Sequence, residues 1–143
     1  MRTKQILCPT DFSETASHAI SYAIEMANFY NVGICLLHVV DKPFGDKYTR
    51  VLAETPDELI ERMEKEAAEK MKQFIATLDE TLSFDTAICH GHPVEQILST
   101  AEKVDAGMIV MASHGRKGLD HFLNSNTTEE VACKAHCPVL VVK

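Results

Sequence analysis

The chain alternates short apolar runs with longer segments of helical periodicity, and this alternation limits the possible folds more than any other feature. The apolar runs cover residues 5–8, 32–40, 83–88, 106–112 and 138–142. Runs such as Ile34 to Leu37 and Met108 to Met111 are nearly continuous, as in strands that helices cover on both faces. The pattern predicts βαβ units, and therefore an α/β fold with a mostly parallel sheet of five strands.

The segments between these runs carry residues that start helices. Ser13 is expected to cap a helix that continues to about Phe29. Thr55 to Glu58 has the sequence of a capping box, with proline at the first helical position. Pro93 opens a third predicted helix, and Asn126 is the predicted N-cap of a fourth.

Length, charge and cysteine content limit the class of protein. The 143 residues fit one domain spanning positions 1–143, and a hydrophobic content of 45% suffices for one core. A net charge of -7 argues against a nucleic-acid partner, whose phosphates attract clustered Lys and Arg. The first apolar run stops at Pro9, too early for a signal peptide or a membrane span. We therefore expect no membrane partner, a cytoplasmic location and five reduced cysteines.

Candidate binding residues follow the strands, because open parallel sheets bind ligands at the carboxyl ends of their strands. The segment after the fourth strand, Met111 to Gly118, combines small residues, two glycines and two basic residues ahead of a helix. Glycines allow the backbone to approach a phosphate closely, and exposed amides at a helix N-terminus attract anions. Neither a Walker motif nor a dinucleotide fingerprint is present, which disfavours P-loop hydrolysis and Rossmann redox chemistry. The candidate phosphate contacts in this segment are Ala112, Ser113, His114, Gly115, Arg116 and Gly118.

The chain resembles the universal stress protein family over nearly its whole length. The segments that carry the resemblance are Ile6–Ser13, Leu37–Val39, Gly91–Pro93, Met111–Gly118 and Cys137–Val142. The resemblance implies a doubly wound sheet of strand order 3-2-1-4-5 with four helices on its two faces. It also implies an adenine nucleotide (ATP, ADP or AMP) at the carboxyl ends of strands 1, 2 and 4. It also implies a homodimer, which in this family is often formed by pairing of the last strand, here 138–142. The implied role is a nucleotide-responsive one in stress regulation.

The resemblance further assigns individual contacts to the nucleotide. It places residues of the first strand end beside the ribose and phosphates and two apolar residues near the base: Pro9, Thr10, Asp11, Val39 and Met111. Two interpretations of Asp11 remain open at this point. Its carboxylate could contact a ribose hydroxyl or a magnesium ion, or it could cap the first helix together with Ser13.

Nucleotide-binding members of the family carry a glycine motif that is altered here. The motif is glycine, two residues, glycine, nine residues, glycine, and then serine or threonine. In this chain the four positions hold Ala112, Gly115, Ser125 and Asn126, so only the second glycine is kept. A serine at the third position would be strained if its φ were positive.

The altered half of the motif has two interpretations. Ser125 and Asn126, with the amides of Thr127 and Thr128, could hold phosphate oxygens at a helix N-terminus. Alternatively, Asn126 only caps the helix and Ser125 is a turn residue.

Two further functions compete with nucleotide binding by a regulatory dimer. One is slow ATP hydrolysis, in which Asp11, a magnesium ion and Arg116 or Lys117 would stabilise developing phosphoryl charge. The other is a nucleotide-free dimer that only contacts other proteins. Ser113 and His114 are adjacent and are expected to point their side chains apart, so no nucleophile and base pair is predicted.

Two groups of Cys and His residues have side chains that could bind a metal ion or react as thiols, but for both we favour a structural role. The segment Cys89-His90-Gly91-His92 has ligand types that suit zinc, yet Pro93 after it is typical of a loop that leads into a helix. We expect no metal site there. Cys133 and Cys137 lie four residues apart and could face a dimer partner.

Overall fold

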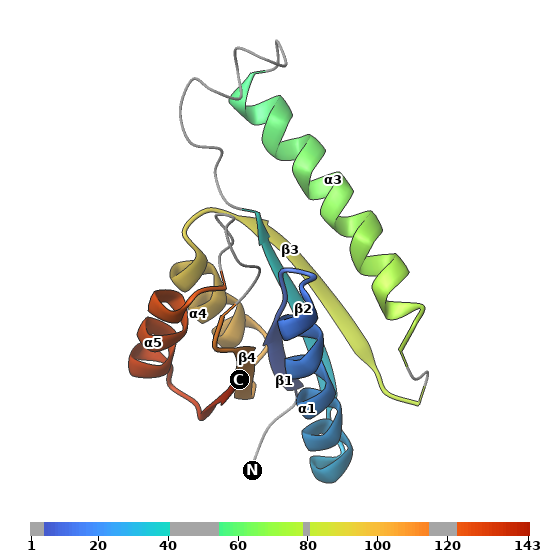
Figure 1. The fold of residues 1–143 in the computed structure, drawn as a ribbon, viewed down its shortest axis with the longest axis vertical. Coiled ribbons are helices and arrows are strands. Elements are labelled where there is room, and N and C mark those ends of the chain that lie inside the picture. Colours follow the sequence, from blue (N-terminus) through green and yellow to red (C-terminus); the bar gives the residue numbers. More distant parts are fainter. Residues whose placement is uncertain (1–4, 41–54, 79–80, 115–122) are drawn as a thin grey trace.

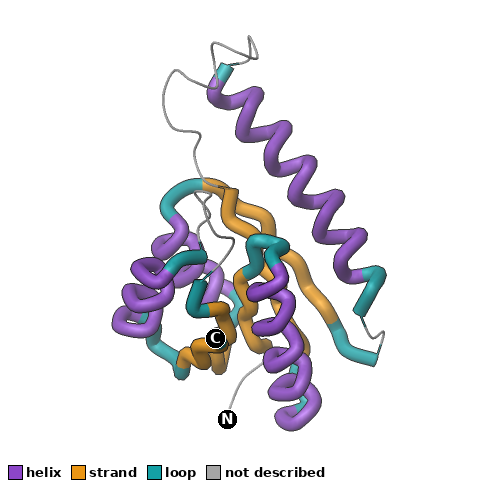
Figure 2. Tube along the Cα trace, viewed as in Figure 1, coloured by secondary structure: helices purple, strands orange, loops and turns teal. Residues whose placement is uncertain are grey.

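The computed structural model describes residues 5–40, 55–78, 81–114 and 123–143, which form one sheet of parallel strands with helices between them (Figure 1). Strand and helix alternate along the chain, as Figure 2 shows by colour. The elements are β1 (Gln5–Pro9), α1 (Glu14–Tyr30), β2 (Gly33–Val40), α3 (Pro56–Ile75), β3 (Phe84–His90), α4 (Pro93–Lys103), β4 (Ala106–Ala112), α5 (Ser125–Lys134) and β5 (Val139–Val142).

The strands lie in the order β3-β2-β1-β4-β5, and every neighbouring pair is parallel. The winding direction reverses at β1, which has β2 on one side and β4 on the other. Right-handed crossovers then place α1 and α3 on one face of the sheet and α4 and α5 on the other. The predicted α/β class and the strand order implied by the family resemblance are both confirmed.

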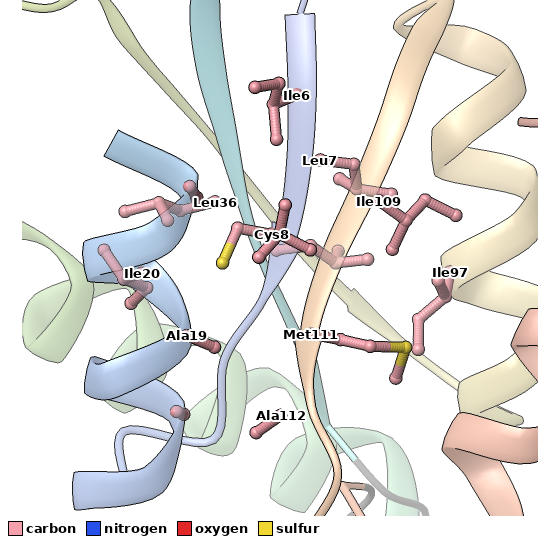
Figure 3. Close-up of a cluster of buried hydrophobic side chains, with 14 of the residues drawn as sticks. Ile6, Leu7, Cys8, Ala19, Ile20, Leu36, Ile97, Ile109, Met111 and Ala112 are labelled. Carbon is pink, nitrogen blue, oxygen red and sulfur yellow. The ribbon is translucent and has the colours of Figure 1, made fainter. Parts of the chain in front are cut away.

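The core fills both faces of the central strands. Figure 3 shows α1 and α4 on opposite sides of β1 and β4, with Ile20 on one side and Ile97 on the other. Ile6, Leu7 and Ile109 have no exposed surface. Burying a side chain of this size contributes about 1.5–3 kcal/mol, so the nearly continuous apolar runs supply most of the driving force for this sheet.

Two of the predicted helix starts have the expected capping hydrogen bonds. The Ala16 amide donates to the Ser13 hydroxyl at 3.1 Å. The Glu58 amide donates to the Thr55 hydroxyl at 3.2 Å, and the Glu58 carboxylate accepts from the Thr55 amide at 3.3 Å. Local sequence thus fixes where α1 and α3 begin.

The predicted cap of α5 is wrong by two residues. Asn124, with extended φ and ψ of -143° and 170°, is the N-cap, and its side-chain oxygen accepts from the Thr127 amide at 2.9 Å. Asn126 lies inside the first helical turn. Either asparagine could cap a helix, and the earlier start places Thr127 and Thr128 in the buried interface with the sheet.

All five cysteines are free thiols. Burial raises the pKa of the Cys35 thiol to about 11 and raises the pKa of the Cys8 thiol still further. Both are therefore protonated, unreactive core residues at neutral pH, as their apolar surroundings in the sequence suggested. Among the described residues, no helix is both long enough and apolar enough to span a membrane.

Candidate functional site

The turn from β1 into α1 is held by bonds between side chains and the backbone. The Phe12 amide donates to the Thr10 hydroxyl at 3.1 Å, and the Ser13 amide donates to the Asp11 carboxylate at 2.9 Å. Phe12 has a φ of 63°, a left-handed conformation that strains a bulky residue. Ser13 alone is the N-cap of α1, and the Asp11 carboxylate holds the Ser13 amide in the turn before the helix. The contact of Asp11 with ribose or magnesium stays a prediction.

The ends of β1 and β2 are joined through His38, which the sequence prediction left out. The Nδ1 atom of His38 donates to the Thr10 carbonyl at 2.8 Å, because a carbonyl oxygen can only accept. The imidazole packs on the Phe12 ring, with the ring centroids 4.7 Å apart and the planes 30° apart. A half-buried histidine near the end of an otherwise apolar strand was the signal available in the sequence.

The two apolar residues expected beside the base are both buried. Val39 has 2% of its surface exposed, and Met111 has none. The side chain of Met111 points toward Ile97 of α4 in Figure 3. Contacts from these residues to a base therefore stay predictions.

The end of β4 is tied to two elements that follow it in the chain. The Thr128 hydroxyl donates to the Ala112 carbonyl at 3.0 Å, and the Ser113 amide donates to the Val142 carbonyl at 2.8 Å. These bonds join Ala112, the first position of the altered glycine motif, to the first turns of α5, and join Ser113 to the end of β5. Gly115, Arg116, Lys117 and Gly118 lie outside the described residues.

The amides at the start of α5 divide into two pairs. Asn124 accepts from the Thr127 amide with its side chain and from the Thr128 amide with its carbonyl, at 2.9 and 3.0 Å. Both amides thus have a partner in the helix cap, and their contact with a phosphate stays a prediction. Ser125 and Asn126 are exposed, and their amides have no acceptor in the part of the chain that the structure describes. The helix dipole concentrates partial positive charge at this pair.

The replaced glycines do not strain the backbone. The described residues other than glycine that have positive φ are Phe12, Asn31 and Asp105, so Ser125 and Ala112 are not among them. Ser125 occupies the first helical position, where any side chain can point outward. Loss of these two glycines leaves an amide-lined helix start intact.

Ser113 and His114 form a contact that the sequence prediction excluded. The Ser113 hydroxyl lies 2.9 Å from the His114 Nδ1 atom. Side chains alternate only inside a strand, and β4 ends at Ala112, so the two residues are free to meet. This pair adds two polar groups to the carboxyl edge beside the start of α5.

The loop before α4 is the helix junction that was predicted. His92 is the N-cap and Pro93 the first residue of α4, and Gly91 has a φ of 126° that favours glycine. The His90 Nδ1 atom lies 2.5 Å from a carboxylate oxygen of Glu64 on α3. Over the described ranges, no group of three or more His, Cys, Asp or Glu side chains is placed to hold a metal ion.

Comparison with known proteins identifies the family. Residues 2–143 match the family model described as the universal stress protein family. Universal stress protein MJ0531 of Methanocaldococcus jannaschii is 34% identical over 98% of this chain and 82% of its own length. The solved structure of MJ0577 superposes with a TM-score of 0.80 at 34% identity, covering 100% of this chain and 97% of that one.

More distant solved structures share the fold. They include a universal stress protein in complex with cAMP, with a TM-score of 0.61 and 20% identity over 100% of this chain and 99% of that one. Another is a universal stress protein from Archaeoglobus fulgidus in complex with dAMP, with a TM-score of 0.60, 20% identity, and 99% and 98% coverage. The match over almost every residue, together with the strand order, shows that this chain belongs to the universal stress protein family.

Proposed function

We propose that this chain binds an adenine nucleotide at the carboxyl ends of β1, β2 and β4 and acts as a nucleotide-responsive regulatory protein. The observation that carries the proposal is the pair of amides at the exposed residues Ser125 and Asn126, which have no acceptor among the described residues, on a helix that the Thr128 hydroxyl joins to Ala112. Solved structures of two universal stress proteins are complexes with the adenine nucleotides cAMP and dAMP, which favours adenine as the base.

The amide pair suits a phosphate group for a physical reason. A phosphate at a helix N-terminus accepts hydrogen bonds from amides that have no helical partner and interacts favourably with the dipole. The dipole contributes about 0.3–1 kcal/mol at exposed sites, and each charge-assisted hydrogen bond adds to it.

The rest of the nucleotide would lie across β1 and β2. Thr10, Asp11 and His38 provide polar groups there, held in place by the turn bonds described above. A magnesium ion near Asp11 belongs to this proposal, since magnesium prefers carboxylate and phosphate oxygens. Gly115, Arg116 and Gly118 are proposed to complete the phosphate contacts.

We also propose that the protein is cytoplasmic and that it forms a homodimer in which the β5 strands of two copies pair. Five free thiols suit a reducing compartment. β5 lies at one edge of the sheet, and an edge strand is a template for pairing with another chain.

The decisive experiment removes a single amide of the pair. Ser125→Pro deletes one N–H at the first helical position, where proline is tolerated, and the extended Asn124 before it is compatible with a following proline. We expect isothermal titration to show at least tenfold weaker binding of ATP, ADP and AMP, with and without magnesium.

Ser125→Ala is the matched control, because it removes the hydroxyl but keeps the amide, and it should bind like the original protein. Unchanged affinity in Ser125→Pro would show that this amide is not a phosphate ligand. No heat with any adenine nucleotide at millimolar concentration would refute nucleotide binding and favour the nucleotide-free interaction protein. Phosphate release over a long incubation with ATP would separate a slow ATPase from a pure binding protein.

A further inference from the structure

Large exposed hydrophobic side chains gather on two neighbouring elements. Among the described residues they are Tyr22, Phe29 and Tyr30 on α1 and Val141 on β5, with 41%, 78%, 38% and 40% of their surfaces exposed. Single exposed apolar residues are normal, but a concentration on adjacent elements is typical of a surface that another molecule covers.

Three ring side chains form a stripe along α1 that we call the aromatic flank: His18, Tyr22 and Phe29. At 100° per residue they fall within about 40° of one another around the helix axis. The rings of His18 and Tyr22 touch edge to face, with their centroids 5.4 Å apart. His18 Nδ1 donates to the carbonyl of Lys143, the residue that follows β5, at 3.2 Å. The aromatic flank therefore faces the side of α1 on which β5 lies.

β5 leaves its outer edge open in the described part of the molecule. Its inner side is used: the Pro138 carbonyl accepts from the Ile109 amide at 2.9 Å, and the Val142 carbonyl accepts from the Ser113 amide at 2.8 Å. Because backbone groups alternate along a strand, Val139 and Val141 direct theirs to the open edge.

Strand pairing alone makes a small interface. β5 has four residues and is about 13 Å long at 3.3 Å per residue. Stable interfaces bury about 1,200–2,000 Å². Aromatic side chains offer about 150–250 Å² each, so Tyr22 and Phe29 from two copies, at their present exposures, would add on the order of 500 Å².

In a sheet paired through β5, the aromatic flank would lie where strand pairing alone leaves interface area uncovered. α1 packs on β4 and β1, so an antiparallel β5 pair would leave two α1 helices on the same face, about 14 Å or more apart across three strand spacings. Helices in direct contact lie 8–10 Å apart. The space above the paired β5 strands would remain uncovered unless large side chains filled it.

We propose that the aromatic flank of α1 and the open edge of β5 together form the interface between two copies of this chain. Tyr22 and Phe29 of each copy cover the paired β5 strands on the α1 face of the joined sheet. This inference rests on the proposed homodimer through β5 and assigns it a second, side-chain contact.

The experiment measures the dimer dissociation constant by sedimentation equilibrium. Tyr22→Ser combined with Phe29→Ser removes the two exposed rings and should weaken the dimer at least tenfold. Ser21→Asn combined with Asn28→Ser changes exposed residues of α1 outside the aromatic flank and should leave the constant unchanged. Val141→Pro removes one backbone donor from the open edge without disturbing the bonds to β4, and should also weaken the dimer at least tenfold. Circular dichroism and nucleotide titration report on the folding of each variant.

The possible results distinguish the β5 dimer itself from the additional contact through the aromatic flank. A dimer weakened by Val141→Pro but not by the Tyr22 and Phe29 double variant overturns the aromatic contact and leaves the β5 dimer standing. A dimer weakened by the double variant but not by Val141→Pro overturns the combined interface. A protein that remains monomeric at high concentration refutes the homodimer and this inference together, while nucleotide titration still tests the binding site independently.

Discussion

At the scale of single residues, the chemistry of the site depends on a few atoms that composition does not reveal. The sequence located Asp11 at the β1 end, and the bond that its carboxylate accepts from the Ser13 amide has the form expected of an aspartate in a turn. His38 was missed because its role arises from a neighbour 28 positions away. The contact between Ser113 and His114 was missed because it depends on where β4 stops.

The left-handed conformation of Phe12 gives a prediction at this scale. Phe12→Ala and Phe12→Gly both remove the ring from His38, but only glycine relieves the strain of a positive φ. We expect Phe12→Gly to be more stable than Phe12→Ala by about 1 kcal/mol in urea unfolding.

The reverse order is expected at Ser21, an exposed residue inside α1, where alanine should exceed glycine by about 0.5–1 kcal/mol. If alanine were also the more stable residue at position 12, the turn would not hold the left-handed conformation in solution.

At the scale of elements, helix starts were predictable wherever two local signals agreed. The reciprocal capping box at Thr55 and Glu58 fixes α3 without help from the rest of the fold. The start of α5 is different, because Asn124 and Asn126 are both good caps. The choice between them follows from burial of Thr127 and Thr128 against the sheet, which local sequence does not encode.

The identity of the cap can be tested by a pair of substitutions. Asn124→Ala removes the acceptor of the Thr127 amide and should cost about 1 kcal/mol of unfolding free energy in urea. Asn126→Ala alters an exposed side chain within the first turn and should cost no more than a few tenths of that value. Equal costs would contradict the assignment of Asn124 as the cap.

At the scale of the whole molecule, the alternation of apolar runs was enough to predict the α/β class and the positions of all five strands. The order of the strands came from the family resemblance, since local sequence does not specify which strands become neighbours. The assembly of the candidate site is a property of the whole fold, because long-range hydrogen bonds join β4 to α5 and to β5.

One of these bonds contributes both to global stability and to the position of the proposed phosphate site. Thr128→Val keeps the side-chain shape but leaves the buried Ala112 carbonyl without its hydroxyl donor, which should cost about 1–3 kcal/mol of unfolding free energy. Thr128→Ser keeps the hydroxyl and should retain most of that stability.

The same substitution should alter the stabilisation that a nucleotide confers. A ligand at 100 times its dissociation constant adds about 2.7 kcal/mol, which corresponds to a rise in Tm of roughly 5–10 °C for a domain of this size. Thr128→Val loosens the link between the start of α5 and the end of β4, so its Tm should rise less at the same ATP concentration. An equal rise in Thr128→Val and Thr128→Ser would mean that the phosphate amides keep their position without this bond, and that α5 alone, rather than its attachment to β4, supplies the phosphate site.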